Sequence, residues 1–512
     1  MNKLVSAAQM RALENDAFDR GVSGEILMEE AAYAAAAEIN RDFPKTKTIT
    51  AVCGKGNNGG DGLALARILH CMGFKVKICL VADTVKTDSA RINLELAKNY
   101  GIEFTNEINS DIVIDAVFGI GIKGGASEPY IDKINEGGEF VISLDIPSGV
   151  CADTGSVSGK AVKANLTLTF GYKKAGLTQY PGKGLAGEIR VLPISVSSGA
   201  FDTFEIDEIN GMLPESAPDD NKGSRGKVLI IAGCAKYLGA AKMCTLAALR
   251  SGCGLVSLML PKNLCGAVYS CINEAVVLPL ECVDYITFDA FIQYEKEITA
   301  ADSIVIGPGL SVSEEVGKIL DYLSDKNKPV IIDADGINSV CRNIDILKKY
   351  KNAAITPHPG EFSRSFGMPI PSVQSDRIEA ARKAAVRTGA TVVLKGASTV
   401  VASPDGMCYV NTTGNPGMAT GGSGDVLTGI LLALLAQPVL AQNHKNSRRN
   451  ENYTPTKEGT PGYYDDKVRH LFKQGLWGTG KTLLNEGLSK YETVSALNEL
   501  MGAYWLHYKK YD

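Results

Sequence analysis

The chain has 512 residues, 45% of them hydrophobic and 21% charged, with a formal net charge of −4. These values are typical of a soluble globular protein of about two to four domains. The small negative charge argues against a basic surface for nucleic acid. We expect no membrane span and no signal sequence, because the apolar runs are too short. The 12 scattered cysteines include no C-x-x-C pair, so we expect reduced thiols and a cytoplasmic location.

The first 200 residues alternate between predicted helices and predicted strands. A capping-box pattern at Ser6 starts a helix over 6–20, and an alanine-rich helix follows over 25–40. The strand 48–53 then opens a regular alternation, which is typical of a parallel sheet covered by helices. The further strands are predicted at 75–81, 111–118, 139–145, 166–170 and 188–193, and the further helices at 63–72, 87–100 and 129–136.

A break in this rhythm over 193–220 predicts a domain boundary near Met212. A second alternation follows, so the sequence predicts an α/β fold with two doubly wound, three-layer domains, 1–212 and 213–512. Strands are predicted at 227–233, 254–260, 303–307, 330–333, 353–356 and 391–395, with helices at 240–251 and 372–388.

The last 75 residues differ from the rest of the chain. Residues 443–464 are polar, which indicates a disordered segment or a loop insertion. Residues 475–482 match the P-loop pattern G-x-x-x-x-G-K-[ST] letter by letter. A P-loop follows a buried strand, but the preceding residues 467–473 are half basic, so we reject this match.

The stretch 415–425 is a glycine-rich turn that ends in Asp425 and is followed by an apolar run. The pattern predicts a turn at the start of a buried helix. Its backbone N–H groups and the helix dipole would hold an anion such as phosphate. A carboxylate is out of place beside an anion unless it has a task. Asp425 is either a general base for phosphoryl transfer to a hydroxyl or an ordinary first-turn aspartate.

A second glycine-rich stretch, 54–62, follows the first predicted strand. It matches the dinucleotide fingerprint G-x-G-x-x-G, with Asp83 at the place of the ribose-binding acid. The two adjacent asparagines and the Gly-Gly-Asp that follows indicate instead a loop for an anion and polar groups. A tight turn that binds no ligand is the alternative.

Two further strand ends carry polar residues. Asp115 ends one predicted strand, and Asp145 precedes Ser148 at the end of another. Because parallel strands end at one edge of the sheet, these residues are expected near Asn58. The oxygens of Asn58, Asp115 and Ser148 suit a hard cation rather than zinc. Capping of the loops is the alternative for each aspartate.

These motifs together resemble a known family. Residues 56–62, 115–119 and 145–149 resemble the NAD(P)H-hydrate epimerases, which have a Rossmann-like domain. The second half resembles the ADP-dependent NAD(P)H-hydrate dehydratases, which have a ribokinase-like fold. Its matching stretches are 237–241, 306–310, 356–361, 394–399 and the turn that ends in Asp425. The order of the two halves is similar to that of the bifunctional repair enzymes, over about residues 1–436.

The resemblance implies a set of roles for the first half. Potassium would be coordinated by Asn58, Asp115 and Ser148. We expect Asp145 to move a proton, with Lys174 as a helper. The hydrated nicotinamide nucleotide, NADHX or NADPHX, would contact Asn57, Asn58, Gly59, Gly60, Asp61, Gly119, Ile120, Gly121, Ile122, Lys123, Gly124, Gly125, Tyr130 and Asp145.

For the second half, the resemblance implies a hydrate site and a nucleotide site. The hydrate site would be lined by Ala240, Gly309, His358 and Asp425, and ADP would be held by Lys395, Gly396, Ala397, Ser398, Thr399 and Gly424. ADP would phosphorylate the hydroxyl of the hydrate, with Asp425 as the base and Mg²⁺ to stabilise charge. For His358, the packing of a proline-flanked turn is the alternative. We also expect a homo-oligomer.

The chain departs from the family pattern after Gln437. We interpret 438–486 as an insertion and the end of the chain as shortened. Three other functions stay open: a ribokinase-like kinase for a small alcohol, a nucleotide-binding protein impaired in catalysis by its altered C-terminus, and a nicotinamide dehydrogenase. The dehydrogenase rests on the lone fingerprint at 54–59.

Overall fold

The structure, a computed structural model, describes residues 2–82, 84–121, 128–206 and 218–437. It divides into two compact units. The first unit comprises Met1–Glu208, Pro357–Arg387 and Thr391–Pro416, and the second comprises Ile209–Thr356, Thr388–Ala390 and Gly417–Asp512. The predicted boundary near Met212 and the predicted insertion 438–486 lie outside the described residues. No helix in the described ranges is long and apolar enough to cross a membrane.

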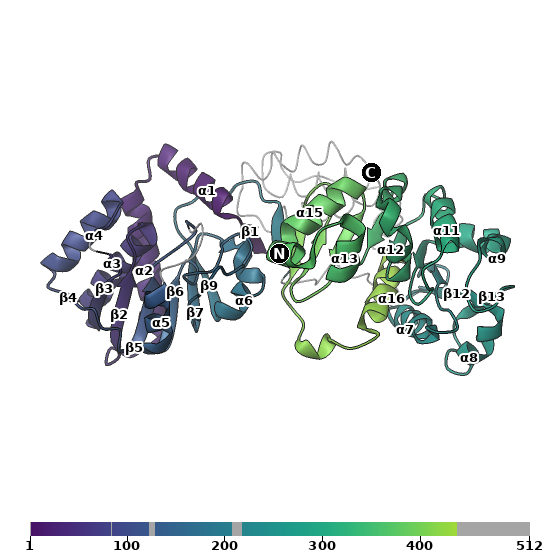
Figure 1. Cartoon of the computed structure of the whole chain (residues 1–512). Coiled ribbons are helices and arrows are strands. Elements are labelled where there is room, and N and C mark those ends of the chain that lie inside the picture. Colours follow the sequence, from purple (N-terminus) through teal and green to yellow (C-terminus); the bar gives the residue numbers. More distant parts are fainter. Residues whose placement is uncertain (1, 83, 122–127, 207–217, 438–512) are drawn as a thin grey trace. The chain divides into compact units, whose positions relative to one another are not determined.

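A seven-stranded parallel sheet forms the centre of the first unit, as the alternation of strands and helices predicts (Figure 1). The strand order is β4-β3-β2-β5-β6-β7-β9, and each neighbouring pair is parallel. The strands are β2 (Thr48–Cys53), β3 (Lys75–Leu80), β4 (Glu103–Phe104), β5 (Ser110–Ala116), β6 (Gly138–Leu144), β7 (Leu166–Phe170) and β9 (Glu188–Leu192).

Helices cover both faces of this sheet. Alanines and leucines of α2 (Gly24–Asp42), α3 (Asn57–Cys71) and α4 (Asp88–Asn99) pack on one face. Ile131 and Ile134 of α5 (Glu128–Glu136) pack on the other. The small alanine side chains let α2 approach the sheet closely. The unit also contains α1 (Ala7–Asp19), α6 (Gly182–Leu185), α13 (Pro359–Phe366), α14 (Ile370–Ser375) and α15 (Arg377–Thr388).

A second set of strands in the first unit comes from distant parts of the chain, and most of it was not predicted. Strand β1 pairs with both β8 and β10, and β10 pairs with β19. This pairing joins residues near 205 to residues near 410. The strands are β1 (Asn2–Val5), β8 (Lys173–Lys174), β10 (Thr203–Ile206), β17 (Thr391–Leu394), β18 (Thr399–Ala402) and β19 (Cys408–Asn411).

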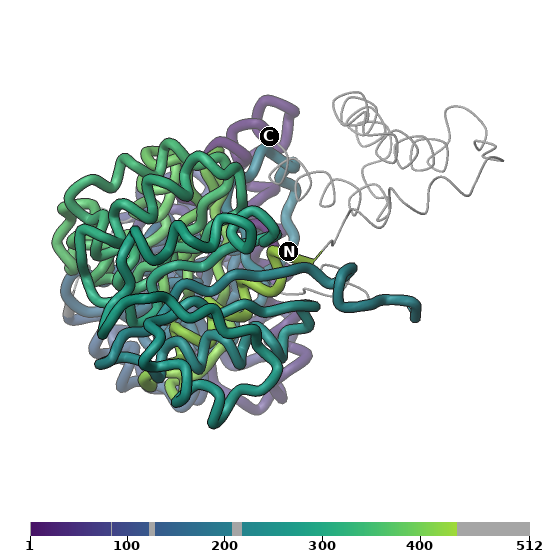
Figure 2. The backbone as a smooth tube through the Cα atoms, turned by 90° about the vertical axis from the view of Figure 1, so that its right-hand side faces the viewer, coloured from purple at the N-terminus to yellow at the C-terminus, as the bar shows by residue number. Residues whose placement is uncertain are grey.

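The second unit is also built on a parallel sheet, with the order β13-β12-β11-β14-β15-β16. Its elements can be followed in teal and green in Figure 2. The strands are β11 (Lys227–Ile231), β12 (Leu255–Pro261), β13 (Val276–Leu280), β14 (Ser303–Ile306), β15 (Val330–Ile332) and β16 (Ala353–Ile355).

Helices α7 (Leu238–Arg250) and α16 (Ser423–Ala436) pack against each other and on this sheet. Their buried side chains share one core with β11 and β12. The hydroxyl of Ser303 on β14 donates to the carbonyl of Leu432 on α16 at 3.0 Å, which ties that helix to the strand. The other helices are α8 (Cys265–Tyr269), α9 (Phe288–Phe291), α10 (Glu295–Ala300), α11 (Glu314–Ser324) and α12 (Asp335–Val340).

Two predicted helices differ from those in the structure. The helix expected at 63–72 begins six residues earlier, at Asn57. The helix expected at 372–388 is interrupted at Asp376, whose φ of −152° and ψ of 77° are not helical. In its place, α14 ends at Ser375 and α15 begins at Arg377.

Candidate active sites in the two units

The residues 57–61 lie in the first turns of α3, not in the loop that the sequence predicts. The helix starts four residues after β2, so this segment stays at the carboxyl edge of the sheet. A Cβ on Gly59 would lie 1.9 Å from the carbonyl oxygen of Gly54, so only glycine lets the two segments approach this closely. Gly59 therefore packs the helix start against the strand end, which is the role of the third glycine in the dinucleotide fingerprint.

The carboxylate of Asp115, at the end of β5, is fully buried. It accepts hydrogen bonds from the hydroxyl of Ser148 at 2.6 Å, the backbone N–H of Ser148 at 2.8 Å and the hydroxyl of Ser143 at 2.8 Å. Burial raises the pKa of Asp115, and these hydrogen bonds partly offset the rise. Two of the three predicted cation ligands, Asp115 and Ser148, are thus in direct contact.

Asn58 supplies a test of the predicted cation site. Its side chain is buried, and neither its amide oxygen nor its amide nitrogen has a hydrogen-bond partner among the described residues. A buried amide without a partner is costly, so a ligand that binds it is favoured. A Cβ on Gly119 would lie 3.3 Å from the Asn58 Cβ and 3.3 Å from Asp145 Oδ2. Gly119 therefore lies between these two predicted site residues.

Asp145 and Lys174 form a buried ion pair. Asp145 has a positive φ of 66°, a conformation that aspartate tolerates better than most side chains. The ammonium of Lys174 also donates to the carbonyl of Phe170 at 2.8 Å and to the hydroxyl of Thr169 at 3.1 Å. These bonds orient Lys174 toward Asp145, so the pair that the sequence only loosely suggested is well defined.

Two more carboxyl groups are affected by the charge of this pair. Burial raises the pKa of Asp61 well above its usual value, and the charges of Asp145 and Glu14 raise it further. Burial also raises the pKa of Glu14, with Asp145 as the next cause. Glu14 lies on α1, and its neighbour Arg11 donates to the carbonyl of Ile120 at 3.2 Å.

Sequence reasoning missed Glu14, because nothing in the helix pattern of 7–19 marks it. Other predicted residues of this site are more exposed or lie outside the described residues. Gly121 is exposed and Ile120 is half-buried, whereas 122–125 lie outside the described residues, as does Asp83. Tyr130 is partly buried on α5.

In the second unit, the glycine turn leads into α16 as predicted. Gly422 occupies the N-cap position with a φ of 90°, and the helix begins at Ser423. Gly424 and Asp425 are therefore in the first turn, and both are partly exposed. This placement is compatible with both interpretations of Asp425, as a general base and as an ordinary first-turn aspartate that interacts favourably with the helix dipole.

A buried network under Asp425 was not predicted. The carboxylate of Asp333, which follows β15, accepts from the hydroxyl of Thr356 at 2.6 Å and from that of Thr428 at 2.7 Å. Thr428 is one turn beyond Asp425 on α16 and also donates to the carbonyl of Gly424 at 3.0 Å. Asp333 therefore connects the ends of two strands to the start of this helix.

Ala240 and Gly309, two residues of the predicted hydrate site, lie next to each other. Gly309 has a φ of 62°, and a Cβ there would lie 3.0 Å from the Cβ of Ala240 and 2.5 Å from the carbonyl oxygen of Tyr237. A side chain at 309 would therefore collide with the start of α7. Gly309 therefore allows its loop to pack closely against the start of α7.

His358, in the first unit, is the N-cap of α13. Its Nδ1 accepts from the backbone N–H of Gly360 at 3.0 Å and from that of Glu361 at 3.4 Å. The Glu361 carboxylate in turn accepts from the backbone N–H of His358 at 2.8 Å. These bonds support the alternative of a structural turn. The His358 side chain is still 52% exposed, and its Nε2 lies 3.4 Å from Oε1 of Glu361.

Residues 395–399 form the tight turn between β17 and β18, also in the first unit. Gly396 and Ala397 are exposed at the outside of the turn, whereas Ser398 is buried. The hydroxyl of Thr399 donates to the carbonyl of Gly396 at 2.9 Å and closes the turn. A short turn with an exposed glycine allows a ligand to approach the backbone.

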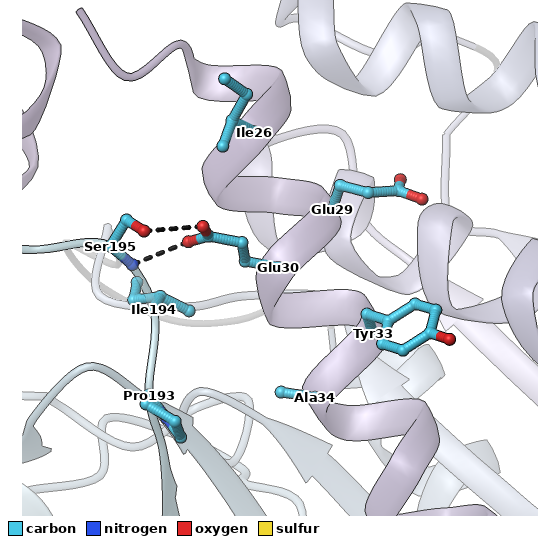
Figure 3. Close-up of a pocket in the computed structure, with 8 residues that line it drawn as sticks. All are labelled: Ile26, Glu29, Glu30, Tyr33, Ala34, Pro193, Ile194 and Ser195. Carbon is cyan, nitrogen blue, oxygen red and sulfur yellow. Dashed lines mark hydrogen bonds between the residues drawn. The ribbon is translucent and has the colours of Figure 1, made fainter.

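A groove between α2 and the segment after β9 lies apart from these residues (Figure 3). Glu30 bridges its two sides, because its carboxylate accepts from the hydroxyl and the backbone N–H of Ser195, both at 2.7 Å. None of the residues that line the groove belongs to the predicted sites. The lining consists of Ile26, Glu29, Glu30, Tyr33, Ala34, Pro193, Ile194 and Ser195.

Two family models match different parts of the chain. Residues 24–176 match the family model described as "YjeF-related protein N-terminus", and residues 228–453 match the model described as "NAD(P)H-hydrate dehydratase". The two matches lie on either side of the predicted boundary.

Curated relatives match both halves at once. The bifunctional NAD(P)H-hydrate repair enzyme Nnr of Thermofilum pendens is 38% identical, over 84% of this chain and 87% of its own. The enzyme of the same name from Escherichia coli is 33% identical over 84% of each chain. Among solved structures, the ADP/ATP-dependent NAD(P)H-hydrate dehydratase of Bacillus subtilis, co-crystallised with ATP and Mg²⁺, is 28% identical. It covers 52% of this chain and 94% of its own, with a TM-score of 0.37. The extent of the Thermofilum pendens match, together with both family models, shows that the chain belongs to the bifunctional NAD(P)H-hydrate repair enzyme family.

Proposed function

We propose that the chain restores hydrated NADH and NADPH to the usable cofactors by two reactions. The first half interconverts the R and S epimers of the hydrate, and the second half dehydrates the S epimer at the expense of ADP. The observation that carries this proposal is the 38% identity to a bifunctional repair enzyme over most of both chains. The buried ion pair of Asp145 and Lys174 in the first half, and Asp425 in the first turn of α16 in the second, support the two reactions.

In the epimerase half, Asp145 moves the proton and Lys174 holds its carboxylate in place. The reacting carbon, C6 of the ring, bears a hydroxyl and a neighbouring ring nitrogen. When Asp145 removes the hydroxyl proton, the C6 oxygen forms a carbonyl and the C6–N bond breaks, with its electron pair passing to the nitrogen, which receives the proton. Reclosure of the nitrogen on the other face of the carbonyl returns the proton to the oxygen and gives the other epimer. Burial and the charge of Asp145 raise the pKa values of its neighbours Asp61 and Glu14.

Potassium fits the residues next to this carboxylate. The amide oxygen of Asn58 lacks a partner, and it lies beside Gly119. Asn58, Asp115 and Ser148 would hold the ion, and the set contains only oxygen ligands, which suit a hard cation. When bound, the ion would supply positive charge near the substrate. Asp115 keeps its own hydrogen bonds to Ser148 and orients the loop in which Ser148 lies.

In the dehydratase half, Asp425 takes the proton of the hydroxyl on C6 while the hydroxyl oxygen attacks the β-phosphorus of ADP. AMP leaves, and the hydroxyl becomes a phosphate ester. The lone pair of the ring nitrogen then expels phosphate, and loss of a proton from the adjacent carbon restores NAD(P)H. A hydroxide is a poor leaving group and a phosphate a good one, which is why the nucleotide is consumed. The N–H groups of the glycine turn stabilise the transferring phosphoryl group.

The nucleotide would be bound by the turn 395–399. Gly396 fits this role, because its exposed backbone lets a phosphate approach. Mg²⁺ would be held largely by the phosphates, as is usual for this ion. Ala240 and Gly309 would contact the hydrate. A homo-oligomer, a cytoplasmic location and the choice between NADHX and NADPHX stay predictions.

The direct test supplies the purified chain with hydrated NADH and ADP. We expect the absorbance of reduced nicotinamide to return, with one AMP and one phosphate formed for each NADH. The matched reaction without nucleotide should leave the absorbance unchanged. No recovery with either ADP or ATP would rule out the dehydratase half.

A ribokinase-like kinase is the second candidate, because the same turn and the same aspartate would serve it. It would leave a stable phosphorylated alcohol in place of free phosphate. Chromatography of the reaction products separates the two outcomes.

A further inference from the structure

Arg377, the first residue of α15, lies buried beneath the turn 395–399. Its side chain is held by neutral acceptors. Nη2 donates to the carbonyl of Leu394 at 2.9 Å and to that of Lys395 at 3.3 Å, and Nη1 donates to the side chain of Gln374 at 2.6 Å. The residue is only 5% exposed. The guanidinium group is therefore fixed at the point where β17 enters the turn.

This buried cation has no counter-ion in the described part of the chain. No ion pair among the described residues involves Arg377, and Nε of Arg377 has no hydrogen-bond partner among them. The carboxylate of Asp376, the preceding residue, accepts from the backbone N–H of Glu379 at 3.1 Å. Burial lowers the pKa of Arg377 to about 10. A buried charge without a partner is costly, so the site favours an anion that binds close by.

A second buried group at the same turn also lacks a partner. Ser398 is 4% exposed and has a φ of 55°, and its hydroxyl has no hydrogen-bond partner among the described residues. Gly396 allows the guanidinium group to lie close to the turn, because a Cβ at this position would be only 2.9 Å from Nη2 of Arg377. The inner side of the turn thus holds a cation and a hydroxyl, while its outer side is open to a ligand.

We propose that Arg377 is the counter-charge and positioning residue of the nucleotide site, holding the turn 395–399 from beneath and attracting the phosphates of a nucleoside diphosphate bound on it. This inference rests on the proposed use of ADP. Lys383, on the same helix, does not share the role, because it is 69% exposed and pairs with Glu379. An exposed lysine is screened by water and contributes little at a distance.

The test compares the binding of ADP with that of adenosine, which lacks phosphates. In the full-length chain, Arg377→Met should weaken ADP binding by about tenfold or more, as expected for a lost charge-assisted interaction, while adenosine binds as before. Lys383→Met, which removes an exposed charge from the same helix, should bind both as the wild type does. Isothermal titration calorimetry measures both ligands. Equal losses for ADP and adenosine, or no loss for ADP, would overturn the proposal.

Two further variants keep the test decisive if Arg377→Met does not fold. Arg377→Lys keeps the charge but not the planar fork, so we expect ADP binding between those of the wild type and Arg377→Met. Ser398→Ala should weaken ADP more than adenosine. Wild-type affinity for ADP in both variants would contradict the proposal. Epimerase activity of each variant reports whether the rest of the chain is folded. Failure of the wild type itself to bind ADP would instead reject the proposed function.

Discussion

The hydroxyl of Thr428 donates a hydrogen bond of 2.7 Å to the buried carboxylate of Asp333. Thr428 is three residues beyond Asp425, so this bond fixes the part of α16 that carries the proposed base. The other oxygen of Asp333 accepts from Thr356, which follows β16. The position of Asp425 is therefore tied to the ends of two strands of the parallel sheet, where ligands of such sheets bind.

Replacement of Thr428 tests this connection. Thr428→Val removes a donor from a buried carboxylate and should lower the free energy of unfolding by about 1–3 kcal/mol. We expect dehydratase activity to fall while epimerase activity stays. Thr428→Ser keeps the hydroxyl and is the matched control. Urea unfolding and both activities provide the measurement, and equal behaviour of the two variants would contradict the role of the bond.

The ion pair between Asp145 and Lys174 leads to a prediction for the epimerase. Asp145→Asn keeps the shape of the side chain, and asparagine also tolerates the positive φ at this position. Loss of the proton-transferring group should reduce epimerase activity by about 10²- to 10⁴-fold. The dehydratase of the same chain serves as the internal control. The interconversion of purified epimers can be followed by chromatography, and a wild-type rate in Asp145→Asn would remove Asp145 from this role.

The raised pKa of Asp61 leads us to expect that the stability of the chain depends on pH. Burial is the main cause that raises its pKa well above 3.8 in the folded chain. The folded state therefore binds the proton more tightly than the unfolded state. This contribution to stability is complete below pH 3.8, and it is lost as the pH rises through the folded pKa.

Asp61→Asn removes this contribution, because asparagine does not titrate. The stability of the variant relative to the wild type should therefore increase as the pH is raised from about 4 to about 8. Urea unfolding of both proteins over this range measures the difference. A difference that stays constant with pH, or decreases, would show that Asp61 does not hold its proton more tightly in the folded chain.

Glu205 holds together distant segments of the first unit. Its carboxylate lies 2.8 Å from the ammonium of Lys173 on β8 and accepts from the hydroxyl of Thr412, beyond β19, at 2.8 Å. It is nearly buried, at 6% exposed. Glu205→Gln removes a charge that two donors share, so we expect the free energy of unfolding to fall by about 1–3 kcal/mol.

The control for Glu205→Gln is Glu188→Gln, since Glu188 pairs with Arg190 at the surface and is 62% exposed. A surface pair of this kind contributes little to stability, because water screens it. Thermal unfolding of the two variants should therefore differ, with the lower midpoint for Glu205→Gln. Equal midpoints would mean that Glu205 does not join the segments in solution.

The sequence allowed the regular parts of both sheets to be predicted, because buried parallel strands are short apolar runs between amphipathic helices. It did not allow β1, β10 and β19 to be placed. These strands have four residues each and pair across some 200 positions of the chain, so no local pattern marks them. The start of α3 was misplaced because a run of glycines favours a loop unless close packing requires them.

The candidate sites could be predicted only in part for a similar reason. Asp145 is marked by its place at the end of a predicted strand, and Asp425 by its glycine-rich neighbours. Asp333, Glu14 and Arg377 act through contacts with other segments, and their own surroundings in the sequence are ordinary. The cap formed by His358 also depends on side-chain geometry that the sequence does not reveal.

The most direct test of the two-step repair starts from a mixture of the hydrate epimers. It measures the fraction of the mixture that is converted to NADH. The wild type with excess ADP should convert the whole mixture. Within a time too short for uncatalysed interconversion, Asp145→Asn should convert only the share of the S epimer, and Asp425→Asn should convert none. Full conversion by Asp425→Asn, or conversion of only one epimer by the wild type, would contradict the repair of both epimers by this chain.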